Sequence, residues 1–513
     1  MTTLLGAVAT RASLQPERAA LVDVASGTRW TYGVLVDRAR ACARTIGVSA
    51  PPKAPVALVA RPRPEVVAAL YGVPEAGNPL VAANLRWTAT DTVKWLRQAR
   101  VGAAVLSHDA RTDLAPWPGP EVTGPQIRAI DIDDLCRDQP GGGEPSGAPS
   151  VVTGTNDAWW VFTSGTTGDP KLARLTHDSL LAASAATQAA RPVQADDVYL
   201  YPFPLFHVSA FNVVHHHTMG ATVVLCSEMD PATIARAVAE HGVTTISLAP
   251  TMIAKLLDHG VDLSSLRRIA YGAAAIHPEL LRRAVDTWGC DFAQGYGMTE
   301  LSGNAVFLDP DAHRRGLSED PSVLLAAGVP APGVTLSIRS TNGLEVPPGE
   351  TGEICVDAPQ VFAGYAHDPT ATASALRDRW LHTGDLGRIR PDGLLEIVDR
   401  GKDVIVTGGE NVASRRVEAA IAATAGVEAV AVVATPDPYW GEAVSAVVVA
   451  ADRATLARAE VHCAAALAGF ERPRRWFLVE QLPLNASGKI DKPALRRLLQ
   501  EAWIVHEVVI ARS

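Results

Sequence analysis

The chain has 513 residues with a formal net charge of −9 at pH 7, 47% hydrophobic residues and 20% charged residues. Such a length exceeds a single hydrophobic core, so at least two domains are expected in a protein of ordinary globular composition. The acidic balance argues against a nucleic-acid binder, because such proteins usually carry a basic excess.

Membrane and secretion signals are also not expected. No apolar stretch approaches the ~18 residues that a membrane-spanning helix needs. The apolar segment 4–9 is too short for the core of a signal peptide and lacks a basic lead-in. The six cysteines are far apart with no CxxC pair, which is typical of reduced thiols in a cytoplasmic protein.

The first part of the chain alternates short apolar runs with helical patterns. Residues 55–60 and 102–106 are predicted to be buried strands, with a helix at 65–71 between them. Residues 137–150 are rich in Pro, Gly and Ser and predict a loop or linker. The alternation resumes from 158 to 300, with strands and helices predicted at 221–226, 231–241, 244–249, 251–258, 268–271 and 278–288. This alternation favours an α/β layered fold.

The last third of the chain has a different pattern. Residues 328–400 carry shorter strands and turns, which predict a small β-rich unit. Beyond residue 402, helices and strands are predicted at 415–424, 427–434, 443–450 and 454–468. The predicted fold is therefore α/β, with a large N-terminal domain of layered α/β subdomains plus a β-rich subdomain over 1–399. A small, mobile α+β lid domain is predicted over 400–513.

The segment from Thr163 to Lys171 is the most informative one. It combines hydroxyl side chains, two glycines and a lysine directly after the apolar run 158–162. Such a loop can present hydroxyls, backbone N–H groups and one cation to a polyphosphate. It is not a Walker A loop, because Asp169 and Pro170 separate the second glycine from the lysine. The alternative is a plain surface loop of the same composition.

A second candidate site segment runs from Gln294 to Glu300. Two glycines flank Tyr296, and Thr299 and Glu300 follow. A tyrosine can stack on a base, glycines allow close backbone approach, and a carboxylate can hold Mg²⁺ beside phosphates. Taken alone, a Gly-Tyr-Gly run is more often an ordinary turn.

Three later segments carry polar residues in glycine-containing loops. Asp385 follows a glycine turn and can accept both hydroxyls of a ribose, although an Asx-type turn is the alternative. The charged, glycine-containing segment 399–403, followed by 407–411, lies at the predicted domain boundary. It is interpreted as a hinge, with a solvated linker as the alternative. The loop 483–492 presents Lys489, and a surface turn is its default interpretation.

Histidines provide weaker candidates. His207 ends an apolar stretch, and a single histidine is more often structural than catalytic. The run His215, His216 and His217 does not predict a metal site, because consecutive residues of one helix point in different directions.

In this order and spacing, these segments resemble the adenylate-forming (ANL) superfamily of acyl- and aryl-CoA synthetases, carrier-protein-loading adenylation domains and luciferases. The resemblance covers essentially the whole chain, and segments 294–300 and 483–489 are most similar to CoA ligases. It implies an enzyme that uses ATP and Mg²⁺ to activate a carboxylic acid as an acyl-AMP, with release of pyrophosphate. The acyl group then passes to the thiol of coenzyme A.

The resemblance also implies roles for matching residues in nucleotide binding. The implied phosphate loop consists of Thr163, Ser164, Gly165, Thr166, Thr167, Gly168 and Lys171. The implied adenine, α-phosphate and Mg²⁺ contacts come from Gln294, Gly295, Tyr296, Gly297, Thr299 and Glu300. Asp385 is implied to bind the ribose hydroxyls with assistance from Arg400.

The remaining implied roles concern the acid, the thiol and the lid. Lys489 matches the lysine that bridges the substrate carboxylate and ATP, and His207 matches an aromatic gate beside the acyl pocket. Gly408 and Gly409 match the loop that lines the pantetheine tunnel, and Lys402 matches the hinge. Since both reactants of the first step are anions, cations must offset their repulsion. A lid that swings about the hinge would then withdraw the lysine before the thiol attacks.

The chain departs from the family pattern at three positions. Leu172 follows the loop lysine where the family usually has glycine. Ser414 and Arg416 replace a proline and a glutamate in a common run of the lid. These changes bear on loop rigidity and lid docking and remove no catalytic group.

The predicted acyl pocket favours an uncharged acid tail. Val208 stands where amino-acid-activating members carry an aspartate, so an α-amino acid is not expected. The predicted pocket residues are small and mostly uncharged, namely Val208, Ser209, Phe211, Tyr271, Gly272, Ala273 and Ala274. An anionic tail has no obvious partner among them, and a fatty, branched or aromatic acid fits better.

Two other functions remain open alongside the CoA ligase. The adenylate could pass to a carrier-protein thiol or another nucleophile instead of free CoA. A nucleotide-binding regulator without catalysis is the third, although the retained Thr299, Glu300, Asp385, Arg400 and Lys489 argue against it. The expected partners are small molecules, with no nucleic acid, and the expected state is a monomer or homodimer.

Overall fold

The computed structural model describes residues 2–85, 87–113, 127–137, 151–163, 170–226, 228–272, 276, 278–401, 403–407, 410–437, 439–485 and 489–505. The chain divides into two compact units. The first unit comprises residues 1–163, 171–335 and 357–381, and the second comprises 164–170, 336–356 and 382–513. The expected mixed α/β class is confirmed, while the domain boundary at 399/400 stays a prediction. In the described part of the chain, no helix has the length and apolar character to cross a bilayer.

The first unit contains a six-stranded sheet in the order β6-β5-β3-β4-β7-β8. Neighbouring strands are parallel except for β8, which runs antiparallel to β7. The strands are β3 (Val56–Val59), β4 (Leu80–Ala82), β5 (Ala103–Leu106), β6 (Arg128–Asp131), β7 (Asp157–Thr163) and β8 (Lys171–Thr176). The two strands predicted near the start of the chain are confirmed as β3 and β5, both fully buried.

Helices accompany these strands in the N-terminal part. They are α1 (Leu4–Leu14), α2 (Tyr32–Ser49), α3 (Pro64–Glu75), α4 (Ala89–Gln98), α5 (His108–Asp113) and α6 (Ile132–Leu135). The predicted helix at 65–71 is confirmed as α3, which begins on Pro64 at a position where the missing N–H costs nothing. Most of the predicted linker at 137–150 lies outside the described residues.

The first unit also contains a nine-stranded sheet, in the order β15-β14-β13-β12-β11-β9-β10-β1-β2. From β13 to β1 the neighbouring strands are parallel, so their carboxyl ends lie along one edge. The strands are β1 (Ala19–Asp23), β2 (Arg29–Thr31), β9 (Val198–Tyr201), β10 (Thr222–Leu225), β11 (Thr245–Leu248), β12 (Arg268–Gly272), β13 (Asp291–Met298), β14 (Gly303–Leu308) and β15 (Val329–Pro330).

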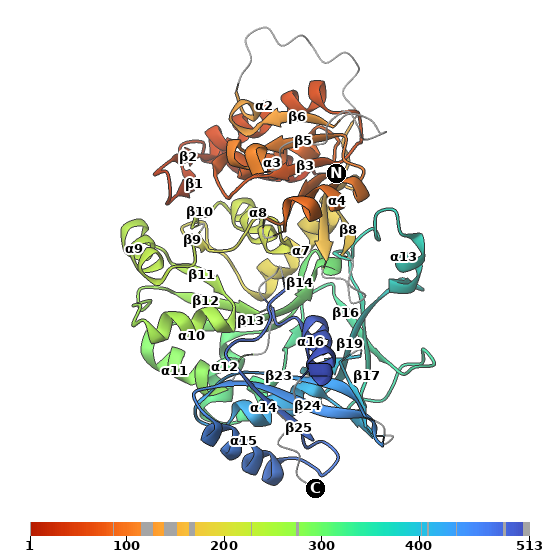
Figure 1. Ribbon diagram of the computed structural model, residues 1–513. Coiled ribbons are helices and arrows are strands. Elements are labelled where there is room, and N and C mark those ends of the chain that lie inside the picture. The colour runs from red at the N-terminus through yellow and green to blue at the C-terminus, as the bar shows by residue number, and fades with distance from the viewer. Residues whose placement is uncertain are drawn as a thin grey trace. The chain divides into compact units, whose positions relative to one another are not determined.

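Helices cover both faces of this sheet (Figure 1). On one face, α9 (Pro231–His241), α10 (Pro250–Asp258) and α11 (Pro278–Trp288) bury a core with alternate strand residues such as Leu200 and Ile269. On the other face, His216 of α8 (Phe211–Met219) stacks on Tyr199 of β9, with ring centroids 3.7 Å apart. The further helices of this unit are α7 (His177–Ala190), η1 (Val208–Ala210), η2 (Thr299–Leu301), α12 (Pro310–Ser318), η3 (Pro321–Leu325) and α13 (Pro369–Ala375).

The β-rich segment expected at 328–400 is confirmed as a five-stranded sheet. Its order is β16-β17-β19-β18, with β20 also paired to β19. The strands are β16 (Thr335–Arg339), β17 (Gly352–Asp357), β18 (Leu376–Arg377), β19 (Trp380–Ile389) and β20 (Leu395–Arg400). Strands β19 and β20 are antiparallel, which pairs Asp385 with Arg400.

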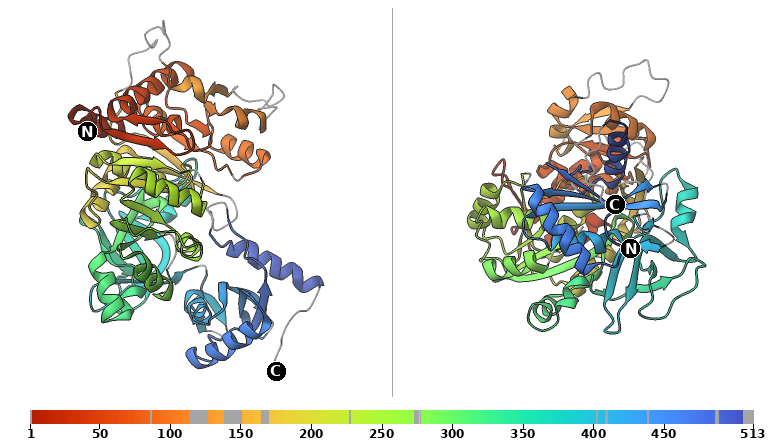
Figure 2. Two further views of the ribbon diagram at one scale, coloured as in Figure 1. Left: turned by 90° about the vertical axis from the view of Figure 1, so that its left-hand side faces the viewer. Right: turned by 60° about the horizontal axis from the view of Figure 1, so that its bottom comes forward.

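The C-terminal segment forms another five-stranded sheet within the second unit, in the order β22-β21-β24-β23 with β25 beside β24. Helices α14 and α15 pack on one face and α16 on the other (Figure 2). The elements are β21 (Ile405–Thr407), β22 (Glu410–Val412), α14 (Ser414–Ala422), β23 (Val427–Asp437), β24 (Gly441–Ala450), α15 (Arg453–Ala466), β25 (Arg475–Val479) and α16 (Lys492–Val505). The small α+β character predicted for this segment is confirmed.

Candidate functional site: two groups of polar residues

In the first unit, a lysine, a tyrosine and a glutamate form a line of successive contacts through Tyr365. The ammonium of Lys171, the first residue of β8, lies 5.0 Å from the centroid of the Tyr365 ring. The hydroxyl of Tyr365 donates a hydrogen bond of 2.7 Å to Oε1 of Glu300, which is 6% exposed. Burial, and then the Glu300 charge, raise the pKa of Tyr365. The phenol therefore stays protonated and remains a donor to the carboxylate.

Backbone hydrogen bonds hold this line in place. The segment around Tyr365 runs along β8, where the N–H of Arg174 donates to the Gly364 carbonyl and the N–H of Ala366 to Leu172. The N–H of Phe362 donates to the carbonyl of Glu300 at 2.9 Å. The segment 362–366 thus joins the strand that carries Lys171 to the short helix η2 that carries Thr299 and Glu300.

Close backbone packing explains the glycines of the Gln294–Gly297 segment. A Cβ atom on Gly297 would lie 2.0 Å from the carbonyl oxygen of Gly303 on the neighbouring strand β14. A Cβ on Gly272 of β12 would lie 2.6 Å from the carbonyl oxygen of Gly295 on β13. Both contacts exclude any side chain, so the end of β13 presents bare backbone around Tyr296.

Phe211 of the predicted acyl segment lies next to this region. His207 precedes η1, and its ring lies 4.4 Å from that of Phe206. The Ser209 hydroxyl and the Tyr201 hydroxyl are 3.1 Å apart. The ring of Phe211 is buried against Gly303, where a Cβ would lie 3.1 Å from it. Phe211 therefore packs against the start of β14, the strand that follows Glu300.

Tyr271 has a defined partner of its own. Its hydroxyl lies 2.8 Å from Nε2 of His313, and its ring is part of the core beneath β12. Burial raises the pKa of Tyr271. Its role in the acyl pocket, and that of Gly272, stays a prediction.

Several predicted residues lie outside the described part of the chain. They are Ser164, Gly165, Thr166, Thr167 and Gly168 of the phosphate loop, Ala273 and Ala274 of the pocket, Lys402, Gly408 and Gly409. The ends of the phosphate loop are described, and Thr163 of β7 is the register partner of Lys171.

The second unit contains the other group, centred on Asp385. This carboxylate is 6% exposed, and its Oδ1 lies 3.2 Å from Nε of Arg400 on the paired strand. The N–H of Gly401 donates to the Gly384 carbonyl at 2.9 Å. Gly384 has a φ of +72°, a left-handed conformation that glycine adopts without strain.

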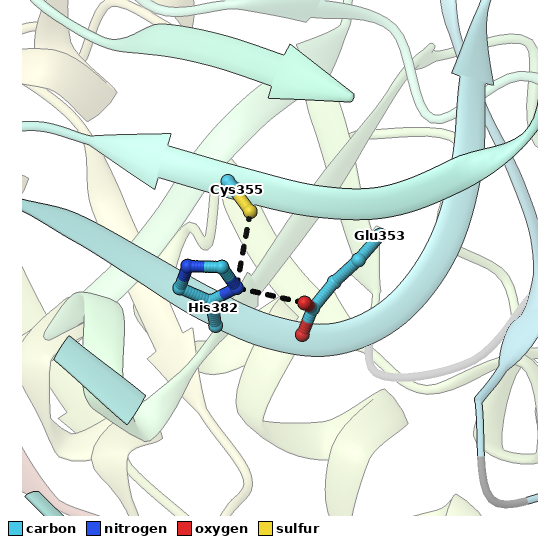
Figure 3. A group of neighbouring side chains, drawn as sticks. All are labelled: Glu353, Cys355 and His382. Carbon is cyan, nitrogen blue, oxygen red and sulfur yellow. Dashed lines mark hydrogen bonds and ion pairs between the residues drawn. The ribbon is translucent and has the colours of Figure 1, made fainter. Parts of the chain in front are cut away.

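A cluster of three side chains supports the loop before Asp385. Figure 3 shows Glu353 and Cys355 of β17 converging on the Nδ1 atom of His382. This nitrogen lies 2.7 Å from Oε2 of Glu353 and 3.4 Å from the Cys355 sulfur. The other Glu353 oxygen accepts the Gly384 N–H at 3.1 Å. Glu353 thereby fixes both His382 and the glycine turn, a role that sequence reasoning missed because no motif marked it.

Lys489 is predicted to meet the substrate carboxylate, and its surroundings perturb its charge. The residue as a whole is exposed, while its ammonium group is withdrawn from water. This desolvation, and then the charge of Arg400, lower the pKa of Lys489 to about 8, whereas Asp385 acts in the opposite direction. The group is therefore poised to titrate near neutral pH.

The departures at 414 and 416 have structural partners within the second unit. Ser414 is buried, its N–H donates to Asp399, and its hydroxyl accepts a 2.7 Å hydrogen bond from Lys492. Arg416 forms an ion pair of 2.7 Å with Glu471. Both replacements are therefore accommodated by specific polar contacts.

The three consecutive histidines of α8 have three different surroundings. Nδ1 of His215 lies 2.9 Å from the Ser184 hydroxyl, and Nδ1 of His216 lies 2.7 Å from the Asn212 carbonyl. His217 contacts the Tyr71 hydroxyl at 2.7 Å. Burial lowers the pKa of His216 to about 3 and that of His217 to about 4. These are neutral core residues that do not converge on one site.

Comparison with known proteins decides the family. Residues 8–366 match the model of the AMP-binding enzyme family, and residues 416–489 match the AMP-binding enzyme C-terminal domain. The chain belongs to the AMP-binding enzyme family. The resemblance to adenylate-forming enzymes is thereby confirmed, and the chain is an AMP-forming acid–thiol ligase of the acyl-CoA synthetase type.

Similar proteins and solved structures cover most of the chain. A feruloyl-CoA synthase of Amycolatopsis is 35% identical over 502 residues, which cover 95% of this chain and 97% of that protein. A fatty acid–[acyl-carrier-protein] ligase of Streptomyces coeruleorubidus is 33% identical and covers 83% of each chain. The o-succinylbenzoate CoA synthetase of Bacillus subtilis, solved with its acyl-adenylate intermediate, superposes with a TM-score of 0.85 at 26% identity over 98% of each chain.

Proposed function

We propose that this enzyme uses ATP to convert a fatty or aromatic carboxylic acid to its CoA thioester through an acyl-AMP. The observation that carries the proposal is the line of contacts among Lys171, Tyr365 and Glu300. It lies beside the end of β13, where glycines leave the backbone uncovered. A cation, hydroxyls, bare N–H groups and a buried carboxylate together suit a polyphosphate and its metal. The relatives named above act on feruloyl and fatty acyl groups, which supports this class of acid.

The donor set around Glu300 fits Mg²⁺. Carboxylate and hydroxyl oxygens are the ligands that this hard cation prefers, and Glu300 supplies the first while Thr299 supplies the second. When bound, Mg²⁺ neutralises phosphate charge and thereby eases attack on the α-phosphate. The Tyr365 hydroxyl orients the Glu300 carboxylate by donating to one of its oxygens.

The first half-reaction needs the substrate carboxylate to approach an anionic nucleotide. In our proposal, Thr299 contacts the α-phosphate, Tyr296 stacks on adenine, and Asp385 accepts the ribose hydroxyls. Arg400 holds the Asp385 carboxylate in position through the 3.2 Å contact. Lys489 bridges the acid and the nucleotide, and its ammonium offsets the repulsion between them. Attack of the carboxylate oxygen on the α-phosphorus then releases pyrophosphate.

The second half-reaction requires the thiol of coenzyme A to reach the acyl carbon of the adenylate. AMP is a good leaving group, so this step needs access more than a further cation. We propose that residues 400–513 move as a lid about Lys402, which removes Lys489 and brings Gly408 and Gly409 to the pantetheine chain. His207 would separate the nucleotide from the acyl pocket.

Transfer to a carrier protein is the second candidate. It is supported by the Streptomyces coeruleorubidus relative, whose name specifies an acyl carrier protein as acceptor. The two candidates share the adenylation step and differ only in the thiol that receives the acyl group.

One incubation tests the proposal. The enzyme is mixed with ATP, Mg²⁺, coenzyme A and a panel of fatty and aromatic acids, and products are read by mass spectrometry. Acyl-CoA together with AMP is the expected result. AMP with acyl-AMP but no acyl-CoA would favour the carrier-protein acceptor, and absence of AMP with every acid would refute the adenylation chemistry.

A further inference from the structure

A small cavity with several polar residues in its lining lies in the first unit, at the amino ends of parallel strands. Its volume is about 20 Å³, and Arg191, Tyr199, Thr245, Ser247 and Arg268 are among its lining residues. Arg191 directly follows α7, while the others belong to β9, β11 and β12. The cavity opens on the same sheet face as α8, because His216 of that helix also lines it.

The two arginines of this cavity have no acidic counterpart in the described chain. Arg191 is 7% exposed, and its guanidinium donates to the neutral Oδ1 of Asn212 at 3.4 Å. Arg268 donates to the carbonyl of Pro192 at 3.0 Å. By contrast, the neighbouring Arg267 forms ion pairs with aspartates at 196 and 197. A buried guanidinium without an anion is costly, so an external anion or strong acceptor would offset that cost.

Several polar groups of the cavity also lack a hydrogen-bond partner among the described residues. Nε of Arg268 and Oγ1 of Thr245 are buried and make no hydrogen bond within the described residues. The Tyr199 hydroxyl is buried beside Ser247, and burial raises the pKa of Tyr199 to about 12, which keeps it a donor. Buried polar groups are normally satisfied, so an oxygen atom placed in the cavity would complete the hydrogen bonding of this set.

Asn212 connects the cavity to the predicted acyl pocket. Its side-chain amide donates to the Ser209 carbonyl at 3.0 Å, while its Oδ1 accepts from Arg191. The same path runs along β9, where the rings of Tyr199 and Tyr201 lie 6.3 Å apart and Tyr201 contacts Ser209. Asn212 and Tyr201 therefore lie between the cavity residues Arg191 and Tyr199 and the predicted acyl-pocket residue Ser209.

We propose that Arg191 and Arg268, with the hydroxyls of Thr245 and Ser247, bind an oxygen acceptor at the far end of the acid substrate. The preferred acids then carry a second carboxylate or a phenolic oxygen remote from the carboxylate that is activated. This inference rests on the proposed function and deepens it. A cavity of about 20 Å³ holds one water-sized group, which suits a terminal oxygen while the body of the acid stays in the acyl pocket. The sequence-based expectation of an uncharged tail considered only residues 208–212 and 271–275, and Arg191 lies outside both segments.

Matched acids test this assignment. Cinnamic acid is compared with 4-hydroxycinnamic and 4-carboxycinnamic acid, and octanoic acid with octanedioic acid, by ATP-dependent pyrophosphate release. Wild-type enzyme should prefer the oxygen-bearing member of at least one pair by at least about tenfold in kcat/KM. The reason is that an acid without the remote oxygen leaves the polar groups of the cavity without a hydrogen-bond partner. Binding of the same acids is read independently as a shift of Tm without ATP.

Two variants and one control complete the experiment. Arg191→Met and Arg268→Gln should each lose at least about tenfold in kcat/KM for the oxygen-bearing acids, and under threefold for the plain ones. The control is Arg283→Met, which removes an exposed arginine paired with Asp258 on the surface and should behave as wild type.

The outcomes separate this inference from the proposed function. Turnover of plain and oxygen-bearing acids with equal kcat/KM, or an equal loss for both in Arg191→Met, overturns the inference and leaves the ligase intact. No turnover and no Tm shift with any acid overturns both. A preference that disappears in both variants supports the inference.

Discussion

Lys489 in the second unit and Arg191 in the first are both cationic side chains whose pKa is lowered by loss of hydration. The charged groups around them differ. Lys489 lies near the carboxylate of Asp385 and near Arg400, and its pKa falls to about 8. Burial lowers the pKa of Arg191 only to about 10, and no acidic side chain in the described ranges pairs with it. A lysine can therefore lose its charge within the working pH range, while the arginine stays charged. The first suits a group that acts in one step and is then withdrawn, and the second suits permanent recognition.

The largest effect is expected when the Lys489 charge is removed. Lys489→Ala should reduce acid-dependent pyrophosphate release by about 10²–10³-fold, because a positioned charge that stabilises the transition state is lost. Thioester formation from supplied acyl-AMP should change little. Lys255→Ala, at an exposed lysine whose ammonium donates to the Met229 carbonyl, serves as the matched control. Equal loss in both half-reactions would contradict a role confined to adenylation.

The next largest effect is expected at Glu300, the buried carboxylate of the first unit. Glu300→Gln should lower kcat/KM for ATP by about 10–100-fold and raise the Mg²⁺ concentration needed for half-maximal rate, because the metal loses a charged ligand. Tyr365→Phe keeps the ring beneath Lys171 and removes one hydrogen bond, so a loss of about tenfold or less is expected. An unchanged Mg²⁺ requirement in Glu300→Gln would argue against metal binding at this residue.

The pH profile sharpens the contrast between lysine and arginine. Because the pKa of Lys489 is lowered to about 8, its ammonium is present below that pH and is lost as the pH rises through it. We expect kcat/KM for ATP, which reports the free enzyme, to fall above about pH 8. Lys489→Arg should retain less activity at neutral pH but show no such fall. A wild-type profile that stays flat to pH 10 would contradict the assignment.

The smallest effect concerns stability without substrate. Arg191 is buried, and no acidic side chain of the described residues pairs with it. Arg191→Met should therefore leave the Tm of the free enzyme unchanged or raise it, as replacing buried charges by apolar groups often does. Arg475→Met is the contrasting variant, because Arg475 forms a 2.9 Å ion pair with Asp437 and its removal should lower the Tm. A large drop in Tm for Arg191→Met would show that Arg191 has a structural role instead.

The fold and the residues of the motifs could be predicted from the sequence because both depend on local physical requirements. Strands such as β3 and β5 are continuous apolar runs, and the turn residues beside Asp385 and Tyr296 are glycines where backbone conformation or contact demands them. These requirements act locally, so they leave a local trace in the sequence. The order of such segments then identified the family.

Contacts between segments that are distant along the chain produce no local sequence pattern from which they could be predicted. Arg191 meets Asn212 and the strands at 199, 245 and 268 only because the sheet brings their amino ends together. Glu353 supports His382 and Gly384 from a strand about 30 positions away along the chain, with separations of 29 and 31. The predicted pocket omitted Arg191 because it considered two short segments, and the composition of either gives no sign of an arginine across the sheet.

The most direct test of adenylate formation follows an oxygen atom. The acid is labelled with ¹⁸O in its carboxylate and incubated with ATP, Mg²⁺ and coenzyme A, and the nucleotide product is analysed by mass spectrometry. Attack of the carboxylate on the α-phosphorus predicts one ¹⁸O atom in AMP for each acyl-CoA formed. Unlabelled AMP, or ADP with the label in inorganic phosphate, would contradict an acyl-AMP intermediate.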